Sequence, residues 1–184
     1  DVLDGGADGD QQRGGEGDDR IVYDAADYVI DGGAGRDTLV LKVGAVVNLA
    51  NLSSSQIAGA TYVSSFENVD ASGASAAVTL TGSQFANSLV GGAGADVITG
   101  GGGADLLTGG FGADTFVFAA SSDSAPTARD VILDFGAGDR IDLSGIDANT
   151  GLAGDQGFTL NNQTGHAGDM AVFYDAQGDR TVVL

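Results

Sequence analysis

The sequence predicts an all-β fold, a parallel β-roll in which short strands alternate with glycine-rich turns. A nine-residue unit, Gly-Gly-x-Gly-x-Asp-x-U-x with U apolar, recurs along the chain. The apolar eighth residue keeps the phase of the glycines, which a flexible linker has no reason to do. Each unit divides into a turn of six residues and a strand of three, and so short a strand buries its face only when successive coils stack.

The first block covers residues 1–40. Units begin at Gly5, Gly14 and Gly32, and a degenerate unit of the same length fills 23–31. The chain starts at the sixth position of an earlier unit, so we expect it to be a segment of a longer protein. We expect an inward row at the eighth positions, interrupted by Gln12 and formed by Leu3, Ile21, Ile30 and Leu39.

An insert follows at residues 41–72. Gly32 and Gly73 are 41 residues apart, which is four nines plus five, so the insert interrupts the period of the roll. The apolar runs at 46–49 and 62–63 indicate strands. We expect an irregular β segment that keeps the sheet stacking and binds little metal.

The second block covers residues 73–117 and is more regular. Uninterrupted units begin at Gly91, Gly100 and Gly109, after two weaker units in which Asn87 replaces the aspartate. The expected inward row consists of Leu80, Leu89, Ile98, Leu107 and Phe116. Beyond it, residues 118–184 lose the repeat, and alternating apolar residues at 129–135, 138–143, 170–174 and 180–184 predict a β cap.

The turns carry the chemistry expected of a metal site. Glycines allow positive φ and let backbone carbonyls approach one another, while the sixth residue adds a carboxylate. Carbonyl and carboxylate oxygens are the ligands that calcium prefers, so we expect several calcium ions. The candidate ligands in the repeats are Asp1, Gly5, Gly6, Asp10, Gly14, Gly15, Gly17, Asp19, Gly32, Gly33, Gly35, Asp37, Asn87, Gly91, Gly92, Gly94, Asp96, Gly100, Gly101, Gly103, Asp105, Gly109, Gly110, Gly112 and Asp114.

Stacking also predicts which acids lie together. The smallest closed coil has two strands and two turns, so units n and n+2 share an edge, about 4.8 Å apart. Asp10 faces Tyr28, which predicts a poor site there. The other predicted neighbours are Asp1–Asp19–Asp37, Asp96–Asp114 and Asn87–Asp105.

Composition narrows the classes of partner. The chain has 26 acidic and 7 basic residues and a net charge of −19, which excludes nucleic acid and anionic membranes and favours cations. It has no cysteine, so disulfides and thiolate metal sites are impossible. No apolar run approaches the roughly 18 residues of a membrane span.

Catalytic motifs are missing from the sequence. His166 is the single histidine, whereas a zinc-protease helix needs the two histidines of H-E-x-x-H. The glycine loops also lack the third glycine of a dinucleotide fingerprint, and no EF-hand loop occurs. We therefore expect a non-catalytic module.

The nonapeptide resembles that of the RTX (repeats-in-toxin) family. The text ADTFVFAASSDSAPTARDVILDFGAGDRIDLSGIDA, followed by GHAGDMAVFYD, resembles the cap after the repeats in serralysin-type proteases and in some RTX lipases and alginate epimerases. The resemblance implies Asp123 and Asp130 as ligands of a terminal calcium. It also implies export by type I secretion machinery and folding in extracellular calcium.

Three kinds of parent protein remain open. The first is a secreted hydrolase or epimerase, which the module would stabilise by contact with the rest of the polypeptide. The second is a calcium-dependent surface-layer or adhesin protein with surface-layer or polysaccharide contacts. The third, an enzyme contained in this chain, lacks a catalytic constellation. The sequence upstream of Asp1 would separate the first two.

Overall fold

The computed structural model describes residues 1–51, 55–60 and 62–146, and beyond them the backbone of 159–160, 169–170, 172–175 and 180–183. These residues form short strands joined by turns, and no helix occurs among them. Most of the strands pair in parallel, which confirms the predicted β-roll. In the described part of the chain, no helix is long and apolar enough to cross a membrane.

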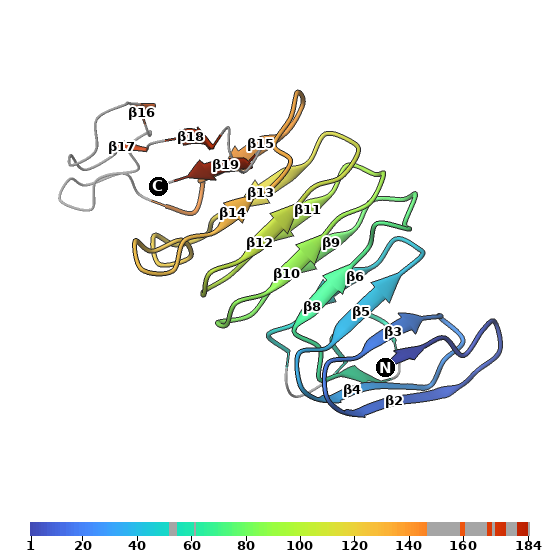
Figure 1. The fold of residues 1–184 in the computed structure, drawn as a ribbon. Coiled ribbons are helices and arrows are strands. Elements are labelled where there is room, and N and C mark those ends of the chain that lie inside the picture. The colour runs from blue at the N-terminus through green and yellow to red at the C-terminus, as the bar shows by residue number, and fades with distance from the viewer. Residues whose placement is uncertain are drawn as a thin grey trace.

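One face of the roll is a nine-stranded sheet, here called the first sheet, which runs the length of Figure 1. It is parallel from β1 to β14, and the last two strands are antiparallel. In spatial order its strands are β1 (Val2–Leu3), β3 (Arg20–Tyr23), β5 (Thr38–Leu41), β8 (Asn68–Asp70), β10 (Ser88–Val90), β12 (Leu106–Thr108), β14 (Val131–Ile132), β19 (Arg180–Val183) and β18 (Val172–Asp175).

The strands that alternate with these along the chain form two further parallel sheets. The second sheet contains β2 (Gln11–Glu16), β4 (Val29–Ala34) and β7 (Val63–Ser64). The third sheet contains β6 (Val46–Asn48), β9 (Thr79–Thr81), β11 (Val97–Thr99), β13 (Thr115–Val117) and β15 (Arg140–Asp142). A separate pair joins β16 (Thr159–Leu160) to β17 (Asp169–Met170).

The insert takes part in all three sheets. Its strand β8 lies between β5 of the first block and β10 of the second, so the first sheet is continuous across it. Buried Gln56 joins the second and third sheets, because its N–H donates to the Val63 carbonyl and its carbonyl accepts from the Asn48 N–H. The Gln56 side chain also bonds the backbone of Leu49 and Phe66.

The core is made of apolar rows that run from coil to coil. Val69 of the insert lies in register between Leu39 and Leu89, and all three side chains are buried. Each row continues because the middle residue of each short strand points inward and pairs in register with the middle residue of the strand in the next coil. The fully buried members include Ile21, Leu39, Leu80, Leu89, Ile98, Leu107, Phe116 and Ile132.

Gln12 occupies an inward position beside Ile30. Its Nε2 donates to the Val22 carbonyl at 3.0 Å and to Asp27 Oδ2 at 2.9 Å. Asp27 is itself buried, and its Oδ1 accepts the Asp10 N–H at 3.0 Å. This coil therefore holds a buried polar pair where its neighbours hold apolar side chains.

Candidate metal centre

Acidic side chains lie buried along both edges of the roll, at the turns. The first edge consists of the turns that lead into the first sheet, and the second edge consists of the opposite turns. Asp37 and Asp105 on the first edge are fully buried, and Asp96 and Asp114 on the second are 1% exposed. Burying a carboxylate costs free energy unless a cation or hydrogen-bond donors satisfy its oxygens. The contacts of each oxygen therefore show whether it is satisfied.

One oxygen of each carboxylate holds the coil before it. Asp37 Oδ1 accepts the Asp19 N–H at 2.8 Å, and Asp114 Oδ1 accepts the Asp96 N–H at 2.8 Å. Asp105 Oδ1 accepts the Asn87 N–H in the same way. These contacts confirm the predicted neighbours Asp19–Asp37, Asp96–Asp114 and Asn87–Asp105.

The second oxygen is the unusual one. It is buried and has no hydrogen-bond partner in Asp19, Asp37, Asp105, Asp114 and Asp130. An unpartnered buried acceptor costs about 1–3 kcal/mol, and more when it is charged. Five such oxygens in equivalent positions indicate a common ligand rather than five separate defects.

The first glycine of each unit shows where that ligand would lie. A Cβ added at Gly14 would collide with Asp19 Oδ2 and with the Gly32 carbonyl oxygen of the next coil. At Gly91 it would collide with Asp96 Oδ2 and the Gly109 carbonyl oxygen. Carboxylate and carbonyl oxygens thus converge on the space that glycine leaves open, and this donor set fits calcium.

The second and fourth glycines of the units shape the turns. Gly15 and Gly17 have φ of 97° and 101°, which a residue with a side chain adopts only with strain. The other predicted second- and fourth-position glycines with positive φ are Gly6, Gly33, Gly35, Gly101, Gly103, Gly110 and Gly112. Gly92 and Gly94 instead pack closely against the backbone of residues 71–77, where a Cβ would clash.

No group of three or more His, Cys, Asp or Glu among the described residues is arranged to hold a metal. A cation here would therefore depend on backbone carbonyls as well as carboxylates. His166 lies outside the described residues.

Burial changes the protonation of these carboxyl groups. It raises the pKa of Asp105 to about 6 and that of Asp130 to about 7, with the Asp105 and Asp123 charges adding to the effect at Asp130. Burial also raises the pKa of Asp37 and Asp114, and neighbouring aspartates add to both. A bound cation would oppose these shifts, so protons and cations compete for the same oxygens.

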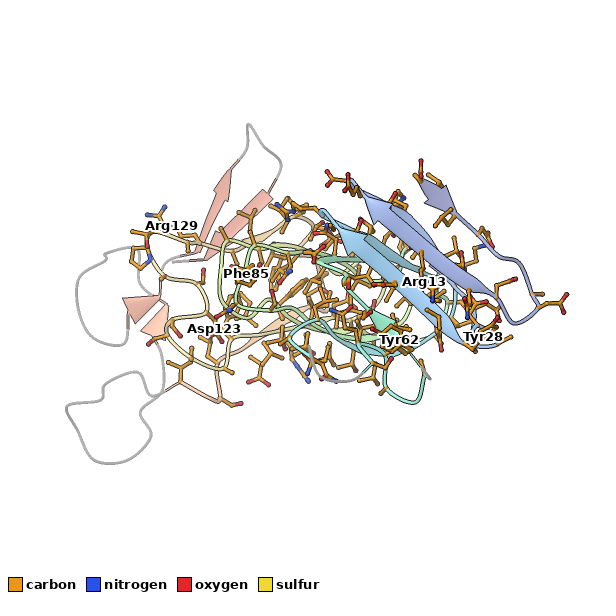
Figure 2. All side chains as sticks on the ribbon, turned by 90° about the horizontal axis from the view of Figure 1, so that it is seen from below. Arg13, Tyr28, Tyr62, Phe85, Asp123 and Arg129 are labelled. Atoms are coloured by element: carbon orange, nitrogen blue, oxygen red, sulfur yellow. The ribbon has the colours of Figure 1, made fainter. Side chains whose placement is uncertain are left out.

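Two sequence-predicted residues at the ends of the first edge lie apart from this pattern. The Asp1 side chain is exposed, and its amino group donates to Asp19 Oδ1 at 2.5 Å. Asp123, labelled in Figure 2, accepts the N–H groups of Ala119 and Ala120 in its own turn. Its charge nevertheless acts on Asp105 and Asp130.

Asp10 faces Tyr28, as the register of Gln11 with Val29 requires. A Cβ on Gly5 would come within 2.6 Å of Asp10 Oδ2. The carboxylate that accepts the Asp10 N–H comes from Asp27, one position before Tyr28.

Several acidic residues of these edges were missed in the sequence. Glu67 Oε2 accepts the Asp37 N–H, and Asp139 Oδ1 accepts the Asp114 N–H at 2.9 Å. Asp134 accepts the N–H groups of Gly109 and Gly110. The signal that could have found Glu67 and Asp139 is the half-repeat acid-x-apolar-x, which survives in Glu-Asn-Val-Asp and Asp-Arg-Ile-Asp without the glycines.

Replacing Asp114 with asparagine should have opposite effects with and without calcium. The amide keeps an acceptor for the Asp96 N–H and removes a buried charge, so without calcium the variant should be more stable by about 1–3 kcal/mol. With saturating calcium it should be less stable by a similar amount, since a charged ligand is lost. Urea unfolding measures the stability of the calcium-bound form. Folding induced by trimethylamine N-oxide in the presence of chelator measures the stability of the calcium-free form.

The matched control for this reversal is Asp8→Asn, because Asp8 is exposed. It should change stability little in either condition. A destabilisation of equal size with and without calcium for Asp114→Asn would contradict a cation at this carboxylate.

Comparison with known proteins gives two findings. The family model described as Peptidase M10 serralysin C terminal matches residues 10–184. The metallopeptidase AprA of Pseudomonas marginalis is 53% identical over 62 residues, which is 33% of this chain and 12% of that protein. The chain therefore matches only a small part of that relative's length.

Proposed function

Because the chain belongs to the family of serralysin C-terminal regions of M10 peptidases, we propose that it is a calcium-binding, non-catalytic RTX module of a secreted protein. The module folds in extracellular calcium after type I secretion and stabilises its parent, a secreted hydrolase of the serralysin type. The observation that carries this proposal is the set of buried aspartate oxygens without partners.

The residues that would hold calcium lie at equivalent places in successive coils. Asp19, Asp37, Asp105 and Asp130 supply carboxylates on the first edge, and Asp96 and Asp114 supply them on the second. First-position glycines leave room for carbonyl oxygens of the adjacent coil. Calcium, when bound, would neutralise these carboxylates and link neighbouring turns.

Without calcium the chain opposes its own folding. A net charge of −19 repels itself, and 32 glycines lose much conformational entropy on ordering. Extracellular calcium modules bind with Kd of about 10⁻⁴–10⁻³ M, so cytosolic calcium would leave the sites empty. An unfolded chain is suited to passage through an export channel.

Outside the cell the balance reverses. At calcium tenfold above Kd, each filled site adds about 1.4 kcal/mol of stability. About six sites would add roughly 8 kcal/mol, which is comparable to the whole stability of a typical domain, about 5–15 kcal/mol. Calcium can therefore decide whether the fold forms.

Circular dichroism of the full chain tests the proposal. We expect β structure in millimolar calcium and its loss in chelator, because the buried carboxylates then repel one another. Magnesium is the control, since it demands a small octahedral shell and should not restore the signal at equal concentration. Unchanged β content after calcium removal would rule the proposal out.

A further inference from the structure

The insert returns to the first sheet through an unusually short turn. The register places Ser64 beside Asp31 and Asn68 beside Thr38. The three residues 65–67 therefore cross the same distance as the six residues 32–37 of the coil before. Ser65 has φ of 63°, in the left-handed region that few residues other than glycine adopt. These three residues contain none of the glycines of the nonapeptide, and only its acidic position is kept, by Glu67.

The short turn nevertheless reproduces the contacts of a repeat turn. Asp37 donates its N–H to Glu67 Oε2 at 2.8 Å, as Asp19 donates to Asp37 Oδ1. The longer glutamate side chain compensates for the missing turn residues. Asn87 in the following coil donates its Nδ2 to the Glu67 carbonyl at 2.6 Å, so the turn is fixed on both sides.

The oxygen cluster beside Gly32 is also reproduced. A Cβ on Gly32 would collide with the Ser65 carbonyl oxygen and come within 2.8 Å of Asp37 Oδ2. A Cβ on Gly14 would collide in the same way with the Gly32 carbonyl oxygen and Asp19 Oδ2. Asp37 is fully buried, and its Oδ2 has no hydrogen-bond partner.

We propose that Asp37 Oδ2, the Ser65 carbonyl oxygen and the Glu67 carboxylate form a calcium site that joins the insert to the first block. The inference rests on the proposed function for the identity of the ion. The site would lie in a turn of the insert that lacks the repeat glycines, where the sequence predicted little calcium binding.

An ion can reach this turn from solvent. A cavity of about 330 Å³ opens beside it, lined by Ser65, Glu67, Ser83 and Phe85 among others, and Phe85 is labelled in Figure 2. Calcium takes about six to eight oxygens in flexible geometry, so water from the cavity can complete the shell. Magnesium, with its stricter octahedral shell, fits such a mixed site less well.

The test compares the two glutamates of the full chain, Glu16 and Glu67. Glu67→Gln keeps an acceptor for the Asp37 N–H and removes the charge, so the chain should bind one calcium fewer, or bind one at least about tenfold more weakly. Glu16→Gln makes the same chemical change at an exposed side chain and should bind like the unsubstituted chain. Equilibrium dialysis with calcium measures the number of ions and their affinity.

Identical calcium binding by Glu67→Gln and the unsubstituted chain would overturn the site. If the variant fails to fold, crystals of the unsubstituted chain grown in calcium decide the matter. An anomalous peak within about 2.6 Å of Asp37 Oδ2 and the Ser65 carbonyl supports the site, and no peak there refutes it. A chain that binds no calcium at all would instead refute the proposed function.

Discussion

Replacing Phe116 with alanine should lower the free energy of unfolding by about 4 kcal/mol. The Phe116 side chain is fully buried, lies in register between Ile98 and Ile141, and packs its ring 6.2 Å from that of Phe135. Its removal leaves a cavity in a row where each coil supports the next. Urea unfolding in saturating calcium, monitored by circular dichroism, measures the loss.

Phe111→Ala is the matched control. Phe111 is 80% exposed in the turn just before β13, so its truncation should change the free energy of unfolding by less than about 0.5 kcal/mol. Equal losses for the two variants would show that the apolar row does not hold the coils together.

Acidification should stabilise the calcium-free fold by about 4 kcal/mol between about pH 8 and pH 5. Burial raises the pKa of Asp105 to about 6 and of Asp130 to about 7 from 3.8. When the folded pKa exceeds the unfolded one, the stabilisation is fully present below about pH 4 and is lost as pH rises through the folded pKa. In calcium the sign should reverse, since protons displace the ion.

Groups with lowered pKa values do not interfere in this range. The hydrogen bond from Lys42 lowers the pKa of Asp4, and that from Ser144 lowers the pKa of Asp142. Their contributions are lost only below about pH 4, so the window between about pH 5 and 8 reports the carboxyl groups whose pKa burial raises, Asp105 and Asp130 most strongly.

The measurement is the β signal of the calcium-free chain as a function of pH. The variant with both Asp105→Asn and Asp130→Asn should show a much weaker pH dependence. Because the sequence pI is about 4.1, sedimentation must show that the acid form is not aggregated. A β signal that stays the same from pH 8 to pH 5 would contradict the buried-carboxylate account.

These two predictions separate the two sources of cohesion in the roll. Phe116 belongs to the apolar row, whose stabilisation depends on buried area and persists at any calcium concentration. Asp105 and Asp130 belong to the first edge, where the same burial is unfavourable until a proton or a cation arrives. The stability of the fold therefore depends on pH and calcium through the buried acids, and not through the apolar row.

The path of the chain through the insert was beyond sequence reasoning. The change of period between Gly32 and Gly73 is visible, but the sequence does not say that β8 continues the first sheet. Closure there depends on buried Gln56, which bonds five backbone groups from segments on either side of it. A polar residue in a serine-rich stretch carries no local sign of that role.

The cap shows the same limit. Asp105 and Asp130 are 25 residues apart, as are Asp114 and Asp139, where the repeat gives 18. The equal offset becomes meaningful only once the strands β14 and β15 are known to add one coil to the roll.

The nine-residue period was enough to predict the coil, with its inward apolar rows, its oxygen-rich turns and the stacking of each unit on the second unit after it. A strict period fixes these, because residues 18 apart must stack when every coil has the same length. The places of Glu67, Asp27 and Asp139 on the edges follow from the three-dimensional fold and could not be predicted from the period. The turns that end at Glu67 and Asp139 differ in length from a repeat turn, and Asp27 lies one position before the acid position of its unit. Backbone pairing across the sheets, rather than spacing along the chain, therefore selects the neighbour of each carboxylate.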